Sequence, residues 1–141
     1  DRLGFGRSSR RAGRPSVDFI SEEAERFFPA IRHALGLARF SLFGHSLGWA
    51  RALVVAALQV VACEAVFTES AQALVESRTL SGIGKAKAKF EDPDQLAKLA
   101  RWHGEKARWV LEAWTEVWLS PSFSLADRAV SMSFEPAARQ R

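Results

Sequence analysis

The sequence predicts an α/β fold with about two parallel strands, flanking helices and a helical region after them. Two short apolar runs, 39–43 and 60–67, have the length and the Val, Ala and Phe content of buried strands. Between them, residues 47–58 favour a helix that is apolar on nearly all sides. Strand, helix and strand in this order form a βαβ unit, whose two strands lie parallel.

A helix is expected before the first strand. Residues 1–15 are rich in Gly, Arg and Ser without an apolar period, which indicates a loop. The apolar residues that follow recur at helical spacing: Ile20, Ala24, Phe27, Ile31 and Leu35. Gly36 is placed to end this helix, and Pro29 is expected to kink it.

The region after residue 67 is expected to be helical, with helices over residues 70–77, 85–90, 94–102 and 105–119. Asp92 and Pro93 suit the N-cap and first turn of the third, and Ser120-Pro121 suits the end of the fourth. The fourth has an apolar stripe made of Ala107, Val110, Leu111, Trp114, Val117 and Trp118. Such a stripe is more often packing, although Trp114 and Trp118 could wall an apolar substrate pocket.

The chain is therefore expected to have three parts. Residues 1–67 form a partial α/β core, residues 68–125 a helical region, and residues 126–141 an irregular basic tail. A pair of parallel strands is marginal in water by itself and is normally covered on both faces. We expect residues 1–67 to be a slice of a larger α/β core, and the tail to reflect truncation or an altered reading frame.

Composition and charge restrict the class of protein. The 141 residues have the length of one modest domain, and 48% hydrophobic with 26% charged residues is ordinary for a globular chain. The 20 Lys and Arg against 16 Asp and Glu give a net charge of +4, and much of the excess lies in Arg2, Arg7, Arg10, Arg11 and Arg14. Such a cluster could bind phosphate or an acidic surface, but a solvated loop is the commoner explanation, so no nucleic-acid partner is favoured.

The cysteine content and the apolar stretches indicate where in the cell the protein is expected. The single cysteine, Cys63, excludes a disulfide within this chain, and the first residues lack a signal-peptide pattern. A cytoplasmic location follows by default. The most apolar stretch, 47–67, carries Arg51 and Glu64, whose charges are costly inside a bilayer. No membrane partner is expected, and the sequence indicates no oligomeric state.

The chemistry is indicated by Gly44-His45-Ser46-Leu47-Gly48, a G-x-S-x-G motif between the first strand and the helix that follows. Strand, turn and helix in this order are the context of a nucleophile elbow, in which a sharp bend lifts the serine clear of the sheet. Gly44 and Gly48 allow the bend and the close packing of strand and helix. Ser46 is therefore the candidate nucleophile, and a chance occurrence of so short a motif is the competing interpretation.

Two motifs together resemble the α/β-hydrolase fold family of serine hydrolases. One is the elbow, and the other is Asp1-Arg2-Leu3-Gly4-Phe5-Gly6-Arg7-Ser8, which is similar to the D-R-x-G-x-G-x-S loop that follows an earlier sheet strand in that family. The helical region from about residue 68 to 123 resembles the family's cap, including the stretches 100–106 and 114–121. The likeness spans residues 1 to about 127, which correspond to the middle of a full-length member.

The resemblance implies a hydrolase that cleaves an ester or related bond of a small molecule, with no metal or organic cofactor. Ser46 Oγ would attack the carbonyl while a histidine removes its proton and a carboxylate orients the imidazole. The Leu47 N–H would supply half of the oxyanion hole. In the family the other half, the acid and the histidine come from segments without a counterpart here, so the chain alone is expected to be inactive or nearly so.

No residue of this chain matches the family's acid or base. His45 adjoins Ser46, and the elbow is expected to direct its side chain away from Oγ. His33 falls on the helix before the strand, and His103 falls in the cap region. Glu69, after the second strand, is the only acid near a strand end, and a helix-capping or surface role is favoured for it.

Two other functions remain open. The segment Gly82–Lys89, which contains Gly82-Ile83-Gly84 and three lysines, resembles the hairpin of helix-hairpin-helix DNA-binding modules, in which backbone N–H groups hold a phosphate. That interpretation leaves both hydrolase-like motifs unexplained. The other function is a noncatalytic helical interaction protein, with the aromatic stripe as its contact surface. The substrate of the hydrolase is not indicated, because specificity depends on pocket shape.

Overall fold

The computed structural model describes residues 1–72 and 75–123, which form two compact units. One unit is residues 18–74, and the other joins residues 1–17 to the chain from residue 75 onward. The sequence-based division differs from this, since it placed residues 1–17 with the α/β part. The expected tail, 126–141, lies outside the described residues.

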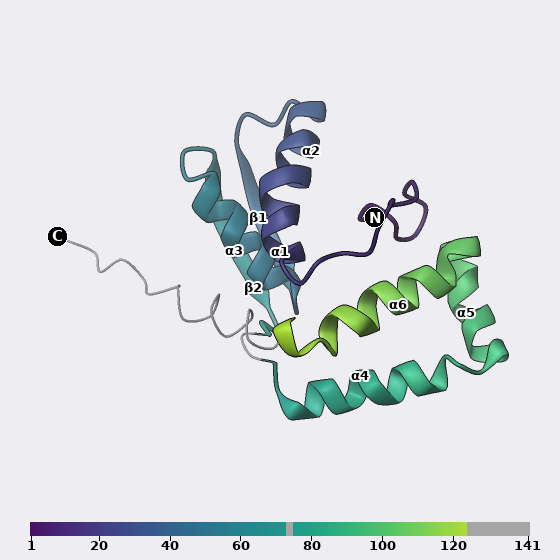
Figure 1. Cartoon of the computed structure of the whole chain (residues 1–141). Helices are drawn as coiled ribbons and strands as arrows, with labels where there is room; N and C mark the ends of the chain where they lie inside the picture. Colours follow the sequence, from purple (N-terminus) through teal and green to yellow (C-terminus); the bar gives the residue numbers. More distant parts are fainter. Residues whose placement is uncertain (73–74, 124–141) are drawn as a thin grey trace. The chain divides into compact units, whose positions relative to one another are not determined.

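The unit of residues 18–74 is a two-stranded parallel sheet with flanking helices, drawn in purple to teal in Figure 1. Its elements in chain order are α1 (Phe19–Glu22), the π-helical segment η1 (Glu23–Phe27), α2 (Phe28–Ala34), β1 (Phe40–His45), α3 (Gly48–Leu58) and β2 (Cys63–Glu69). β1, α3 and β2 make the predicted βαβ unit. This confirms an α/β arrangement with about two parallel strands and flanking helices.

One face of the sheet carries the core of this unit. Phe40 of β1 is buried together with Ala24 of η1, Val55 of α3 and Ala62, which precedes β2. The ring of Phe28 lies edge-on to that of Phe40, with 5.0 Å between the centroids. The helical segments on either side of β1 in the sequence therefore pack on the same side of the sheet.

The opposite face of the sheet is exposed. Phe43 and Phe67 are partners in the parallel ladder, and their exposed fractions are 68% and 60%. Side chains alternate between the two faces along a strand, so both phenylalanines point away from the face that holds Phe40. The sequence predicted cover on both faces, whereas among the described residues only the Phe40 face is covered.

The helix before β1 has its irregularity ahead of Pro29 rather than at it. Proline has no N–H to donate to the carbonyl four residues earlier, and the π-helical segment η1 lies immediately before that break in the hydrogen-bond ladder. Pro29 itself lies in the first turn of α2, where no donor is needed. Gly36, with a φ of +63°, follows the end of the helix as predicted.

The second strand starts later than predicted. The N–H groups of Ala62 and Cys63 both donate to the Gln59 carbonyl, each at 2.9 Å, and this closes a turn over Val60 and Val61. Val61 is 96% exposed. These β-branched residues favour a strand by local preference, but β preference depends on burial, which the turn denies them.

The second unit is helical, with the elements α4 (Ser77–Lys89), α5 (Pro93–His103), the 3₁₀ segment η2 (Gly104–Lys106) and α6 (Ala107–Trp118). α6 packs against both α4 and α5. Asp92 caps α5 as predicted, since its side chain accepts the Asp94 N–H at 2.8 Å. The predicted helix over 70–77 is wrong at residues 70, 71, 72, 75 and 76, and the one over 85–90 corresponds to the last part of α4.

The arginines of the amino-terminal loop are partly engaged in ion pairs with the helical unit. Arg10 pairs with Glu105 at 2.7 Å, and Arg14 contacts both Glu112, at 2.7 Å, and Glu116. Glu112 and Glu116 are one turn apart on α6, so a single guanidinium can reach both. Part of the basic cluster is thus neutralised within the chain.

Across both described ranges, no helix combines the length and the apolar character needed to cross a lipid bilayer.

Candidate functional site

Ser46 occupies the bend between β1 and α3. Its backbone has a φ of +52°, in the left-handed region that residues with a Cβ rarely adopt. Among the described residues, one other non-glycine residue has a positive φ, Ser70 at +49°, directly after β2. A left-handed conformation costs a residue with a side chain about 1–2 kcal/mol, so the surrounding contacts must hold Ser46 in place.

Two backbone hydrogen bonds fix this bend. The Ser46 N–H donates to the carbonyl of Glu69 at 3.0 Å, and the Trp49 N–H donates to the Ser46 carbonyl at 3.1 Å. The first bond ties the bend to the end of the neighbouring strand, and the second ties it to the first turn of α3. The sharp strand-to-helix turn predicted from the motif is therefore present at Ser46.

The two glycines of the motif have different roles. A Cβ built on Gly44 would lie 2.6 Å from the Gly48 carbonyl oxygen and 2.8 Å from Trp49 Cα, so the helix backbone passes directly over it. Gly48 has no atom within 4 Å of the corresponding position. The close approach of strand and helix thus depends on Gly44, whereas both glycines were expected to permit it.

Leu47 is the N-cap residue of α3, with helical backbone angles. Its N–H donates to no acceptor within residues 1–72 and 75–123, as is usual for the first amides of a helix. The positive end of the helix dipole lies at the same place. Both properties suit stabilisation of negative charge next to Ser46.

The structure brings His45 and Glu69 to the same edge of the sheet as Ser46. They are register partners at the carboxyl ends of β1 and β2, and the side chains of both are exposed. Within the described part of the chain, Ser46 Oγ has no hydrogen bond to a histidine or a carboxylate. His33 lies in the last turn of α2, before the opposite end of β1, and is exposed.

The two tryptophans predicted as a pocket wall differ in exposure. Trp118 is buried, and its ring packs against Phe123 with 5.1 Å between the centroids. Trp114 is 37% exposed. The Trp118 ring is therefore used in packing within the helical unit, and Trp114 is the member of the pair whose ring remains open to a ligand.

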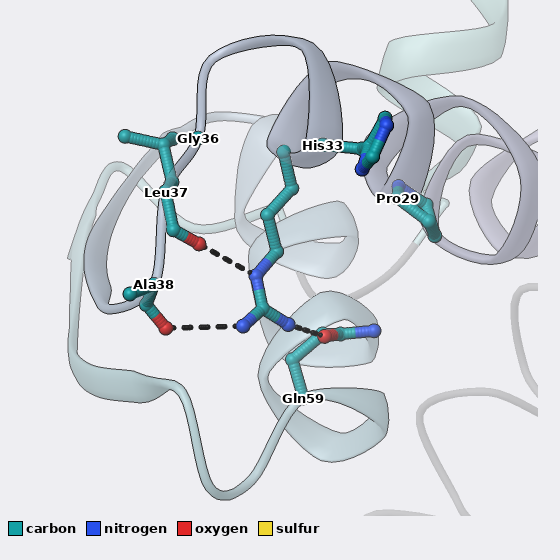
Figure 2. Close-up of a pocket in the computed structure, with 7 residues that line it drawn as sticks. Pro29, His33, Gly36, Leu37, Ala38 and Gln59 are labelled. Atoms are coloured by element: carbon teal, nitrogen blue, oxygen red, sulfur yellow. Dashed lines mark hydrogen bonds between the residues drawn. The ribbon is translucent and has the colours of Figure 1, made fainter.

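A pocket that the sequence did not indicate lies before the amino end of β1. It has a volume of about 390 Å³ and is lined by Arg32 together with the residues labelled in Figure 2. Arg32 Nε donates to the Leu37 carbonyl at 2.8 Å, Nη2 donates to the Ala38 carbonyl at 3.0 Å, and Nη1 donates to Gln59 Oε1. With these three acceptors Arg32 joins the end of α2 to the turn after α3, so this pocket is a structural junction away from Ser46.

The segment proposed as a DNA-binding hairpin is helical. Gly82, Ile83 and Gly84 all lie inside α4, and Ile83 is buried. In a helix interior the backbone N–H groups are bonded to carbonyls of the preceding turn, so they are not presented to a phosphate. The turn expected between two short helices is therefore wrong. No signal in the sequence marked it as a helix, because two glycines so close together normally disfavour one.

Comparisons with known proteins add no family. No family model matches the chain, and no curated protein matches it. Within the described residues, no three His, Cys, Asp or Glu side chains are grouped so as to hold a metal ion.

Proposed function

We propose that this chain is the nucleophile-bearing part of a serine hydrolase of the α/β-hydrolase type, which acts on an ester or related bond through Ser46. The observation that carries the proposal is the bend at Ser46, a positive φ between a parallel strand and a helix, with Gly44 against the helix backbone. Backbone strain of this kind is typical of residues held for a function, and a serine on such a bend exposes its hydroxyl at the end of the sheet.

In this proposal Ser46 Oγ forms a bond to the acyl carbon, and the Leu47 N–H donates to the oxygen on which negative charge develops. The alcohol of the ester then leaves, and water releases the acyl group. The proton of Ser46 must pass to a base, and the described residues offer no hydrogen-bonded candidate at Oγ. We therefore expect the isolated chain to lack efficient turnover.

The helical unit would then act as the cap, with Trp114 beside a small apolar substrate. A cytoplasmic location and chemistry without a metal or organic cofactor belong to the same proposal. The partially exposed Trp114 supports this role for the helices, because an indole in contact with solvent can bury itself against an apolar ligand.

The reactivity of position 46 can be tested by placing a thiol there. In a Cys63→Ser background, Ser46→Cys would be alkylated with iodoacetamide between pH 6 and 9. A thiol at the start of α3 should have a lowered pKa, and a decrease of one unit raises its thiolate fraction at pH 7 about eightfold, which makes its alkylation there faster. Ser41→Cys is the matched control, because Ser41 is exposed on β1 and does not lie at the start of a helix. A rate at position 46 equal to or below that control would contradict the proposal.

Turnover tests the second part of the proposal. The purified chain should hydrolyse p-nitrophenyl acetate no faster than its Ser46→Ala variant does, because a serine without a base is a weak nucleophile. Efficient hydrolysis that is lost in Ser46→Ala would support the hydrolase assignment but contradict the inferred lack of a base.

A further inference from the structure

The amino-terminal loop is joined to the helical unit through a histidine. The N–H of Gly6 donates to Nδ1 of His103 at 2.8 Å, and His103 is the last residue of α5. An imidazole nitrogen accepts a hydrogen bond only when it carries no proton, so the ring proton lies on Nε2 and His103 is neutral. The contact is therefore specific for one protonation state.

Aromatic packing fixes the loop at this point. The Phe5 ring lies edge-on to both His103 and Trp109, with centroid distances of 6.4 Å and 5.7 Å. A Cβ on Gly4 would lie 2.4 Å from the Trp109 ring, so the loop backbone is seated directly on that ring. The Gly6 N–H cannot turn toward another acceptor without loss of these contacts.

The groups of η2 around His103 do not favour its charged form. The Lys106 ammonium donates a hydrogen bond to the carbonyl of Ser8, which adds a second link between the loop and the helices. Glu105 is paired with Arg10 at 2.7 Å. Burial and the charge of Lys106, in that order, lower the pKa of His103.

Two charged groups of the loop, those of Asp1 and Arg2, have contacts within the loop. The Asp1 carboxylate accepts the N–H of Arg7 at 3.0 Å. The Arg2 guanidinium lies 4.1 Å from the centroid of the Phe5 ring. From α6, the uncharged ring of Trp109 contacts Phe5. A proton on His103 would thus meet a nearby cation and a facing N–H donor.

We propose that His103 is a pH-sensitive latch, whose neutral imidazole holds the loop of residues 1–15 on the helical unit and whose protonation releases it. Protonated Nδ1 becomes a donor that faces the Gly6 N–H, so an attractive contact turns into a repulsive one. The ion pairs of Arg10 and Arg14 are exposed or half-exposed and cannot compensate fully, because ion pairs in contact with solvent contribute little to stability.

The direction of the pH effect follows from proton linkage. In the released state His103 would have an ordinary pKa of about 6.5. Because its pKa is lower when the loop is docked, the released state takes up a proton first as the pH falls. Docking is strongest above about pH 6.5, and between the two pKa values the ratio of docked to released chains falls about tenfold per pH unit.

Amide hydrogen exchange of Gly6, followed by NMR on the full chain between pH 5 and 8, tests this latch. After correction for the intrinsic exchange rate, the protection of Gly6 should decrease below about pH 6.5. In His103→Gln the side-chain oxygen can accept the same bond without titration, so protection should not change with pH. His33→Gln, an exposed histidine of the other unit, should behave as the unsubstituted chain does.

Two results would overturn the proposal. One is a constant protection of Gly6 across this range in the unsubstituted chain, and the other is the same decrease in His103→Gln. If the loop of His103→Gln does not dock at pH 8, the proposal is tested instead by an NMR titration of the His103 ring protons in the unsubstituted chain. A midpoint below 6.5 that coincides with the loss of Gly6 protection supports the latch, and separate midpoints contradict it.

Discussion

The backbone of α3 passes so close to Gly44 that a methyl group there has no room. The atoms that a Cβ would meet, the Gly48 carbonyl oxygen and Trp49 Cα, are backbone atoms that cannot rotate away. Strand and helix would have to separate. Gly44→Ala should therefore lower the free energy of unfolding by about 1–3 kcal/mol, as measured by urea denaturation.

Gly48→Ala is the control for that substitution. It lies in the same motif, but a Cβ there meets no atom within 4 Å. Gly48→Ala should change the free energy of unfolding by no more than about 0.5 kcal/mol. Equal losses in the two variants would show that the close approach at Gly44 does not decide the stability of the bend.

Residue-level features were predictable only where a local motif encodes them. The bend at Ser46 was expected because G-x-S-x-G specifies it between a strand and a helix. The acceptor of the Ser46 N–H, the Glu69 carbonyl, comes from another strand, and the partner of Gly6 lies 97 residues away in His103. Such pairings depend on tertiary structure and have no local signal.

At the level of elements, the helical conformation of α4 leads to a prediction about its two glycines. A Cβ on Gly82 or Gly84 meets no atom within 4 Å, and both residues lie inside the helix. Alanine has a higher helix preference, so Gly82→Ala and Gly84→Ala should each raise the free energy of unfolding by about 0.5–1 kcal/mol. Urea denaturation followed by circular dichroism would measure this.

Gly104→Ala is the matched control, because Gly104 also has open space but adopts a φ of +58° after α5. That substitution should be destabilising by about 1 kcal/mol, since alanine is strained in this conformation. If Gly82→Ala were destabilising to the same degree, a tight turn at Gly82–Gly84 would be favoured over the helix.

Element types were predicted better than element boundaries. Asp92 and Gly36 are strong end signals because each satisfies backbone requirements by itself, and both act as predicted. Val60 and Val61 favour a strand locally, yet hydrogen bonding to the Gln59 carbonyl places them in a turn. The helical state of Gly82–Gly84 depends on burial of Ile83, which local preference does not include.

At the scale of the whole molecule, the uncovered sheet face is an exposed apolar surface of the α/β unit. Phe43 and Phe67 lie side by side on it. Replacement of both by serine should reduce binding of the dye ANS to the native chain. Because neither ring contributes to the buried core, the free energy of unfolding in urea should change by less than about 1 kcal/mol.

Phe40→Ala is the contrasting variant. Phe40 lies on β1, as Phe43 does, but is buried with Ala24 and Val55. Its replacement by alanine should therefore lower the free energy of unfolding by about 3–5 kcal/mol. A comparable cost for the Phe43 and Phe67 replacement would show that their face is covered in solution.

The grouping of residues 1–17 with the helices was not predictable from composition. A loop rich in Gly and Arg indicates solvent exposure, and its contacts with Trp109 and with His103 join chain segments far apart in the sequence. The predicted α/β arrangement, in contrast, rests on neighbouring segments that pair through one crossover.

The bond from the Ser46 N–H to the Glu69 carbonyl also sets an order of events during synthesis of the chain. Residues 40–58 can leave the ribosome and start their helix while the acceptor is still inside the exit tunnel. The Ser46 backbone can be held by both of its hydrogen bonds only after residues 63–69 have emerged and joined β1. A nascent chain stalled before that point would carry the whole motif without the bond that ties its bend to β2.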